Sequence, residues 1–138
     1  MINTIVDCIL ELDPVAKQRP RVFTDALGKT RAFTPDKTRN AESKIKIMVK
    51  KWMIENQQQP TDAPVFMRLG FFFHTDDEKK LKSRHTSHPD LDNLVKTVCD
   101  ALNNIAYLDD KQIVHLTAQK EYWARPSSIS IVISETIL

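Results

Sequence analysis

Hydrophobic residues recur along the chain with two different periods, and these periods predict its secondary structure. Alternation with a period of two is typical of strands, whereas recurrence every three or four residues is typical of a helix. Runs rich in β-branched or alternating apolar residues predict four strands, at residues 4–12, 64–75, 112–123 and 127–133. The last two are separated by Ala124-Arg125-Pro126 and are expected to form a closing antiparallel hairpin.

Two segments carry the helical period. Thr34-Pro35-Asp36 supplies an N-cap residue, a proline for the first helical position and an acid for the first turn, so one helix is expected to begin there and to end near Asn56. A second helix is expected over residues 90–105, directly after Pro89. The expected buried positions are Ala41, Ile45, Met48, Val49, Trp52 and Met53 in the first helix, and Leu91, Leu94, Val95, Val98, Leu102 and Ile105 in the second.

Two other segments lack a sustained period and are interpreted as loops. Residues 15–34 interleave five Lys or Arg with Phe23 and Phe33, which predicts a long basic loop or loose hairpin that reaches toward a ligand. Residues 76–89 have almost no apolar content and predict a surface loop. The element order is therefore β-loop-α-β-loop-α-β-β. We expect an α+β fold in which a mixed β-sheet packs against two helices, as a single domain over residues 1–138.

Composition narrows the class of protein without defining it. With 41% hydrophobic residues and no apolar run near the roughly 18 residues of a membrane span, a membrane role is not expected. The opening MINTIVDCIL has no basic region before its apolar stretch and no cleavage site, so it predicts a first strand and a cytoplasmic protein. Cys8 and Cys99 have no CxxC or Cys/His spacing and are interpreted as packing residues. No small-molecule cofactor is expected.

Charge is distributed unevenly along the chain. Residues 17–51 hold eleven Lys or Arg against three acids, a balance of +8, although the whole chain carries only +2. A second basic run, residues 79–84, precedes the densest group of carboxylates. Positive flanks beside a negative centre are what a nuclease needs, because cations hold phosphates and acids hold a metal. Either basic run alone is explained equally well by a solvated loop or helix face.

Four carboxylates, Asp90, Asp92, Asp109 and Asp110, fall within 21 residues and are joined by a short predicted helix, so we expect them to converge at one edge. Oxygen ligands of this kind suit Mg²⁺, which proteins hold with one or two carboxylates, waters and substrate phosphates. The alternative is structural, because acids in a first helical turn cap the helix and complement its dipole. Capping accounts for one or two of these side chains.

Lys96 lies four residues after Asp92, one turn along the same helical face. Two interpretations stay open for it, an ordinary ion pair across one turn and a cation that stabilises charge developing on a scissile phosphate. The four histidines show no HxxxH or HxH spacing, which gives zinc little support. His85 and His88 are near enough to the acidic cluster in sequence to contact DNA.

Three linked motifs now point to a family. DLDNLVK at residues 90–96, DAL at 100–102 and LDDKQ at 108–112 together resemble the signature of the RusA family of Holliday junction resolvases, which are common in prophages. The dense part of the resemblance covers about 23 residues. More loosely, the basic element at residues 17–21, the proline at the first helix start and the chain length are also similar to that family.

The resemblance implies a homodimer that binds four-way junction DNA and makes paired symmetric nicks with Mg²⁺, with Mn²⁺ able to substitute. It further implies a role in DNA recombination and repair and a prophage origin. A two-fold enzyme suits a two-fold substrate. Two other functions stay open, a non-catalytic DNA-binding module and a nuclease that acts on flaps or RNA.

Position by position, the resemblance implies that Asp90, Asp92 and Asp110 bind the metal and that Lys96 completes the catalytic set. Asp109 and Asp100 are expected to play supporting or structural roles. The residues expected to contact DNA are Lys17, Arg19, Arg21, Arg31, Lys79, Lys80, Lys82, Arg84 and His88.

One feature departs from the family pattern. Family members place an arginine directly before the first motif aspartate, whereas this chain has His88-Pro89 there. Either Arg84 or His88 takes the place of that arginine, or the DNA contacts differ locally.

Overall fold

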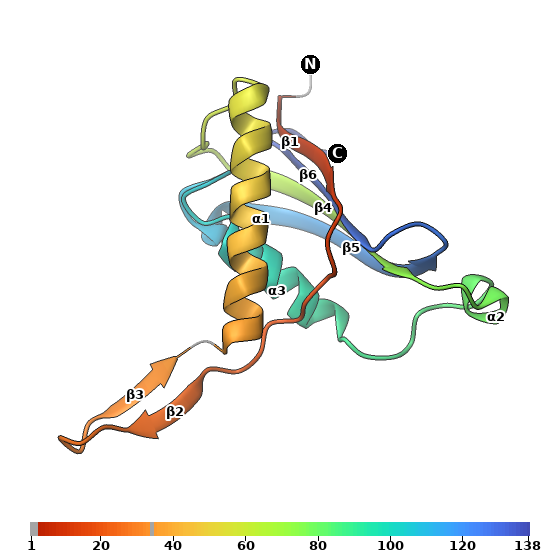
Figure 1. Ribbon diagram of the computed structural model, residues 1–138. Coiled ribbons are helices and arrows are strands. Elements are labelled where there is room, and N and C mark those ends of the chain that lie inside the picture. Colours follow the sequence, from red (N-terminus) through yellow and green to blue (C-terminus); the bar gives the residue numbers. More distant parts are fainter. Residues whose placement is uncertain (1–2, 34) are drawn as a thin grey trace.

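A computed structural model describes residues 3–33 and 35–138. The chain folds into a four-stranded mixed sheet with helices packed on it and a separate two-stranded hairpin, which confirms the expected α+β class (Figure 1). In chain order the elements are β1 (Thr4–Leu10), β2 (Arg21–Thr24), β3 (Thr30–Phe33), α1 (Asp36–Glu55), β4 (Val65–His74), α2 (Glu78–Leu81), α3 (Leu91–Ala101), the 3₁₀ turn η1 (Asp110–Gln112), β5 (Ile113–Trp123) and β6 (Ser128–Ser134).

The sheet has the strand order β1-β6-β4-β5. β6 is antiparallel to both β1 and β4, whereas β5 is parallel to β4 and forms an edge. The expected hairpin between the last two strands is therefore wrong, because β4 lies between them. Burial accounts for the arrangement: alternating Ile and Ser residues let β6 pack as a central strand, while the mostly polar, exposed middle of β5 suits an edge.

α3 connects the parallel strands β4 and β5, as a parallel pair requires a crossover. It packs against α1 and β5, and α1 packs against β1. This crossover matters for function, because the predicted acidic residues lie at the two ends of α3.

One face of the sheet and the inner faces of the helices form the hydrophobic core. The alternation predicted for β4 is confirmed, since every second residue from Val65 to Phe71 is buried. The helical periods are confirmed in the same way. The fully or nearly fully buried helix residues are Ala41, Ile45, Val49 and Met53 in α1, and Leu94 and Val98 in α3. Leu102, just after α3, is buried with them.

The start of α1 lies one residue later than expected. Pro35 occupies the N-cap position and Asp36 begins the helix, with the acid in the first turn as predicted. The predicted cap, Thr34, lies outside the described residues. The helix ends at Glu55, close to the expected Asn56.

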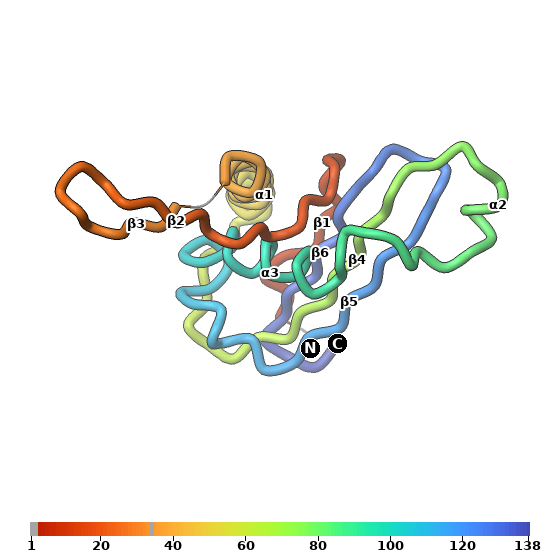
Figure 2. Tube along the Cα trace, turned by 90° about the horizontal axis from the view of Figure 1, so that it is seen from below, coloured from red at the N-terminus to blue at the C-terminus, as the bar shows by residue number. Residues whose placement is uncertain are grey.

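The hairpin alternative is confirmed for the basic segment, and the loop expected at residues 76–89 contains a short helix. Residues 15–33 include the β2–β3 hairpin, which projects from one end of the molecule, and residues 76–89 include the one-turn helix α2, which lies at the opposite end (Figures 1 and 2). Asp77 stabilises the start of α2, because its side chain accepts a hydrogen bond from the Lys79 backbone and caps the turn. The first strand ends at Leu10 and not at Leu12.

The two cysteines pack in or against the core, as expected. Cys99 is buried and Cys8 is partly buried, and burial raises the pKa of each thiol to about 11. Within the part of the chain that the structure describes, no helix is long and apolar enough to cross a membrane.

Candidate functional site

Asp90 and Asp92 lie at the start of α3 with exposed carboxylates. Asp90 occupies the N-cap position, but its side chain makes no capping hydrogen bond, so the helix start does not consume its carboxylate. Instead, Asp90 Oδ1 lies 3.3 Å from Nδ1 of His88. Asp92 Oδ1 accepts a bond of 2.9 Å from the Asn93 backbone and keeps its other oxygen available. A purely capping role therefore does not account for Asp90.

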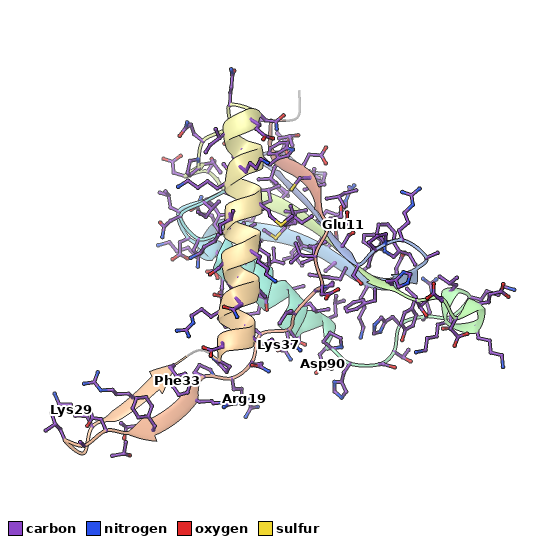
Figure 3. All side chains as sticks on the ribbon, in the orientation of Figure 1. Glu11, Arg19, Lys29, Phe33, Lys37 and Asp90 are labelled. Carbon is purple, nitrogen blue, oxygen red and sulfur yellow. The ribbon has the colours of Figure 1, made fainter. Side chains whose placement is uncertain are left out.

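The backbone that leads into Asp90 is held by Lys120 on β5. Lys120 Nζ donates to the carbonyl oxygen of Ser87 at 2.6 Å and to that of Pro89 at 2.9 Å. Figure 3 places Asp90 where the loop from α2 enters α3. Since both carbonyls bind one ammonium group, the sheet edge fixes the approach of the chain to Asp90. No local sequence signal marked Lys120, which lies 31 residues from Pro89.

A second group of carboxylates gathers at the other end of α3. Asp110 is half-buried, and its backbone N–H donates to the side-chain oxygen of Asn103 at 2.8 Å. Burial, together with the neighbouring carboxylates of Asp109 and Asp100, raises the pKa of Asp110. These acids repel one another, so a cation bound beside them would be stabilised.

In the motif LDDKQ, two residues stabilise the turn and one is free to bind a metal. The Asp109 side chain caps η1, and Gln112 completes the capping box with its side-chain oxygen. The amide nitrogen of Gln112 also donates to the carbonyl oxygens of Thr61 and Ala63, both at 2.9 Å. Asp109 and Gln112 therefore fix the turn. The Asp110 side chain lies beside Asp109 and Asp100 and takes no part in the capping box, which favours it over Asp109 as a ligand.

Two lysines approach Asp100. Lys17 Nζ lies 2.6 Å from Glu42 and 3.2 Å from Asp100, and its side chain is only 15% exposed. Although burial opposes it, hydrogen bonding to these two carboxylates raises the pKa of Lys17. Lys96 Nζ lies 3.9 Å from Asp100. The charge of Lys17 is thus neutralised inside the fold, whereas the DNA contact expected of it requires an exposed cation. Lys96 pairs with Asp100 and not with Asp92.

The expected convergence of all four carboxylates does not occur within one chain. Asp90 and Asp92 lie at the start of α3, and Asp110 lies beside Asp100 at its end. An α-helix of 11 residues is about 16 Å long, which keeps the two groups apart. Within residues 3–33 and 35–138, no group of three or more His, Cys, Asp or Glu is placed to hold a metal ion.

The basic residues lie on two arms beyond the ends of the sheet. Arg19, Arg21 and Arg31 lie on or before the β2–β3 hairpin, with Arg31 Nε 2.7 Å from Asp25. Lys79, Lys80, Lys82 and Arg84 lie in or after α2 and are all exposed. The arms project on opposite sides of the α3 helix, so cations border the acidic centre in space as well as in sequence (Figure 2).

His85 is buried, so the DNA contact considered for it from the sequence is wrong. Its ring stacks on Tyr122 with centroids 4.2 Å apart and packs against Phe73. Burial, followed by the charges of Lys120 and Lys80, lowers the pKa of His85. Its neighbour in sequence, the exposed His88, is the histidine that reaches Asp90, which favours His88 over Arg84 at the position of the family arginine.

Exposed carboxylates between basic arms are typical of proteins that act on the phosphodiester backbone of nucleic acids. Residues 11–134 match the family described as Endodeoxyribonuclease RusA, so the chain belongs to the RusA family, a family of endodeoxyribonucleases. It is 30% identical to the Crossover junction endodeoxyribonuclease rusA of Lactococcus phage r1t, across 80% of this chain and 83% of the phage protein. It is also 30% identical to the uncharacterized protein YqaN of Bacillus subtilis (strain 168), across 94% of this chain and 98% of that protein.

Proposed function

We propose that the protein is a metal-dependent endodeoxyribonuclease that resolves Holliday junctions by paired symmetric nicks during DNA recombination and repair. The observation that carries this proposal is the pair of exposed carboxylates, Asp90 and Asp92, on a loop and helix start anchored by Lys120. Family membership and the name of the phage relative support the junction as substrate.

The donor chemistry of the site fits a hard divalent cation. All the proposed ligands, Asp90, Asp92 and Asp110, offer carboxylate oxygens, which suit Mg²⁺ and Mn²⁺. The raised pKa of Asp110, caused by burial and by Asp109 and Asp100, is relieved when a cation binds. A bound divalent cation supplies a water with lowered pKa and stabilises charge on the leaving oxygen.

The chain's own residues position the phosphate and balance its charge. Lys96 has a 62% exposed side chain on the helical face that also carries Asp92 and Asp100. Its distance of 3.9 Å from Asp100 is that of a weak pair, so Lys96 is free to turn toward an approaching phosphate. The exposed cations Arg19, Arg21, Lys79, Lys80, Lys82 and Arg84, with Arg31 and His88, bind the DNA backbone on either side.

The position of the acids at opposite ends of α3 supports a homodimer. A symmetric pair of chains completes each metal site with Asp90 and Asp92 from one copy and Asp110 of the partner subunit. The same two-fold symmetry provides two sites for two strands of a four-way junction. Two symmetric sites in one dimer would account for the proposed pairing of the nicks.

Comparing substrates tests the proposed function. The purified protein is incubated with labelled four-way junctions, flaps, duplex, single strands and the corresponding RNA, while Mg²⁺ and Mn²⁺ are titrated. Cleavage of the four-way junction well above all other substrates is the expected result. Binding to junctions without nicking at any metal concentration would favour a non-catalytic DNA-binding module, and faster cleavage of flaps or RNA would assign a different substrate.

A further inference from the structure

The β2–β3 hairpin takes no part in the core. It forms a two-stranded sheet of its own, separate from the main sheet, and every residue of both strands is exposed. Figures 1 and 2 both show it projecting away from the helices and the main sheet. An isolated two-stranded hairpin is at best marginally stable in water. The hairpin therefore adds little to the stability of the fold, and packing of the core does not explain why it is present.

The strand register gives this hairpin one distinctive face. Arg21 pairs with Phe33, and Phe23 pairs with Arg31. Because directly opposed residues share a face and side chains alternate along a strand, all four lie on the same face. The opposite face carries smaller side chains, namely Val22, Thr24, Thr30 and Ala32. On one side of the hairpin, two arginines and two phenylalanines therefore alternate both along and across the strands. We call this side the Arg/Phe face.

The two rings of the Arg/Phe face are in contact and yet open to solvent. The centroids of Phe23 and Phe33 lie 5.8 Å apart with an angle of 66° between the rings, an edge-to-face pair. Phe23 is 46% exposed and Phe33 is 42% exposed. Figure 3 shows Phe33 on the projecting hairpin near its base, with Lys29 at the tip. Exposed aromatic rings beside cations indicate a binding surface.

The tip of the hairpin holds this face in a fixed shape. One Asp25 oxygen accepts hydrogen bonds from the backbone of Leu27 at 2.9 Å and Lys29 at 3.0 Å, while the other binds Arg31 Nε at 2.7 Å. Gly28 has a φ of +79°, a conformation that glycine adopts without strain. The turn therefore pre-organises the rings and Arg31 before any ligand arrives.

We propose that the Arg/Phe face stacks on bases that lack a stacking neighbour at the branch point of DNA while its arginines hold the adjacent phosphates. Interleaved aromatic rings and cations are the chemistry that recognises single-stranded or unstacked nucleotides, because every base offers a face for stacking. A branch point exposes such bases and continuous duplex does not. This inference rests on the proposed function and names the element that distinguishes branched DNA from duplex.

Charge argues for DNA over a second copy of the chain. Residues 19–33, which include the hairpin, hold four Lys or Arg against one acid, a balance of +3, so two such hairpins repel one another. A phosphate backbone is attracted to the same charges. The occupant of the Arg/Phe face is therefore nucleic acid.

Paired substitutions on the two faces of the hairpin test the proposal. The test variant combines Phe23→Ala with Phe33→Ala, and the control combines Thr24→Ala with Thr30→Ala. Binding to a four-way junction and to a duplex of the same sequence is measured by fluorescence anisotropy with Ca²⁺ in place of Mg²⁺, so that cleavage does not interfere. Base stacking on an aromatic side chain is large enough that loss of both rings should weaken junction binding at least roughly tenfold. Duplex binding and the control variant should change less than about threefold.

A fluorescent base reports stacking directly. 2-Aminopurine placed at the branch should change its emission on binding of the wild-type chain and lose that change with the test variant. Phe23→Leu combined with Phe33→Leu keeps the apolar bulk of the hairpin and should behave like the alanine variant, which separates loss of stacking from loss of folding. Unchanged junction affinity and emission in the leucine variant would overturn the proposal.

Two other outcomes are distinguishable. A test variant that shifts the sedimentation coefficient without changing junction selectivity would make the Arg/Phe face a contact between copies of the chain, which overturns the proposal. Wild-type protein that binds junction and duplex equally would contradict the proposed function itself. Wild-type selectivity that survives in both phenylalanine variants contradicts only the stacking.

Discussion

Lys120 Nζ lies 2.9 Å from the carbonyl oxygen of Pro89, the residue directly before Asp90. The same nitrogen also binds the carbonyl of Ser87 at 2.6 Å. One ammonium group on the edge strand β5 thus holds two backbone carbonyls of the loop that leads into Asp90. Because hydrogen bonds to charged groups are among the stronger ones in proteins, this contact has a measurable effect on the site.

Replacing Lys120 by methionine should misplace Asp90 without removing any DNA-binding residue. Small displacements of catalytic groups reduce rates steeply, so we expect kcat on a four-way junction to fall roughly 10- to 100-fold while the junction Kd changes less than threefold. The Mg²⁺ concentration that gives half-maximal cleavage should rise. Lys120→Arg keeps donors at the same position and should recover part of the rate, and a variant with wild-type metal dependence would show that Lys120 only stabilises the fold.

Replacing Lys17 by methionine should lower stability. The substitution leaves Glu42 and Asp100 facing each other without the ammonium that now lies 2.6 Å and 3.2 Å from them. Lys96 stays near Asp100, but Glu42 loses its partner, and a partly buried carboxylate without a partner costs roughly 1–3 kcal/mol in the free energy of unfolding, measured by urea denaturation. Lys46→Met, at an exposed position of α1, is the control and should change stability by less than about 0.5 kcal/mol. Equal effects of the two substitutions would contradict the structural role of Lys17.

Stability should also depend on pH through His85. Burial and the charges of Lys120 and Lys80 lower the pKa of His85 from 6.5, so the unfolded chain binds the proton more readily than the folded one. The free energy of unfolding should therefore decrease as the pH falls through about 6.5. His85→Phe keeps a ring against Tyr122 and removes this titration. Urea denaturation between about pH 8 and pH 5 should show a smaller loss of stability for the variant, and identical profiles would contradict the assignment.

Mixed dimers test whether each metal site is shared between two chains. Asp92→Asn and Asp110→Asn are carried on chains with different affinity tags, and the heterodimer is purified through both tags. If each site combines Asp92 of one chain with Asp110 of the partner subunit, one of the two sites in the heterodimer retains every aspartate. We expect the heterodimer to nick one strand of a junction although both homodimers are inactive. An inactive heterodimer would show that each chain supplies a complete site.

The sequence predicted those features that depend on local pattern. The buried positions Ile45 and Val49 of α1 and the alternation along β4 follow from periodicity, because a period reports directly which side of an element meets the core. The neighbours of each strand do not follow from it. β5, whose residues 114–117 are exposed, and the Ile-rich β6 are adjacent in the chain but separated by β4 in the sheet. Only the burial of β6 on both sides reveals a central strand.

The candidate site was predictable in part for the same reason. The motif located Asp90, Asp92 and Asp110 in the sequence, but the rigid length of α3 separates them, which spacing along the chain does not disclose. Lys17 was counted among exposed cations, yet its partner Glu42 lies 25 residues away in sequence. Contacts between distant segments are set by tertiary packing, so charge counts along the chain do not reveal them.

Cleavage of a synthetic four-way junction by the wild-type chain and by Asp92→Asn tests the central claim most directly. The four strands are labelled separately, binding is measured in parallel, and Mg²⁺ is titrated from zero. We predict that the wild-type chain nicks two opposite strands only when Mg²⁺ is present. The variant should bind the junction at least as tightly, because it lacks one negative charge near the phosphates, and should not cleave it. Substantial cleavage by Asp92→Asn, or cleavage by the wild-type chain that needs no divalent cation, would contradict the account.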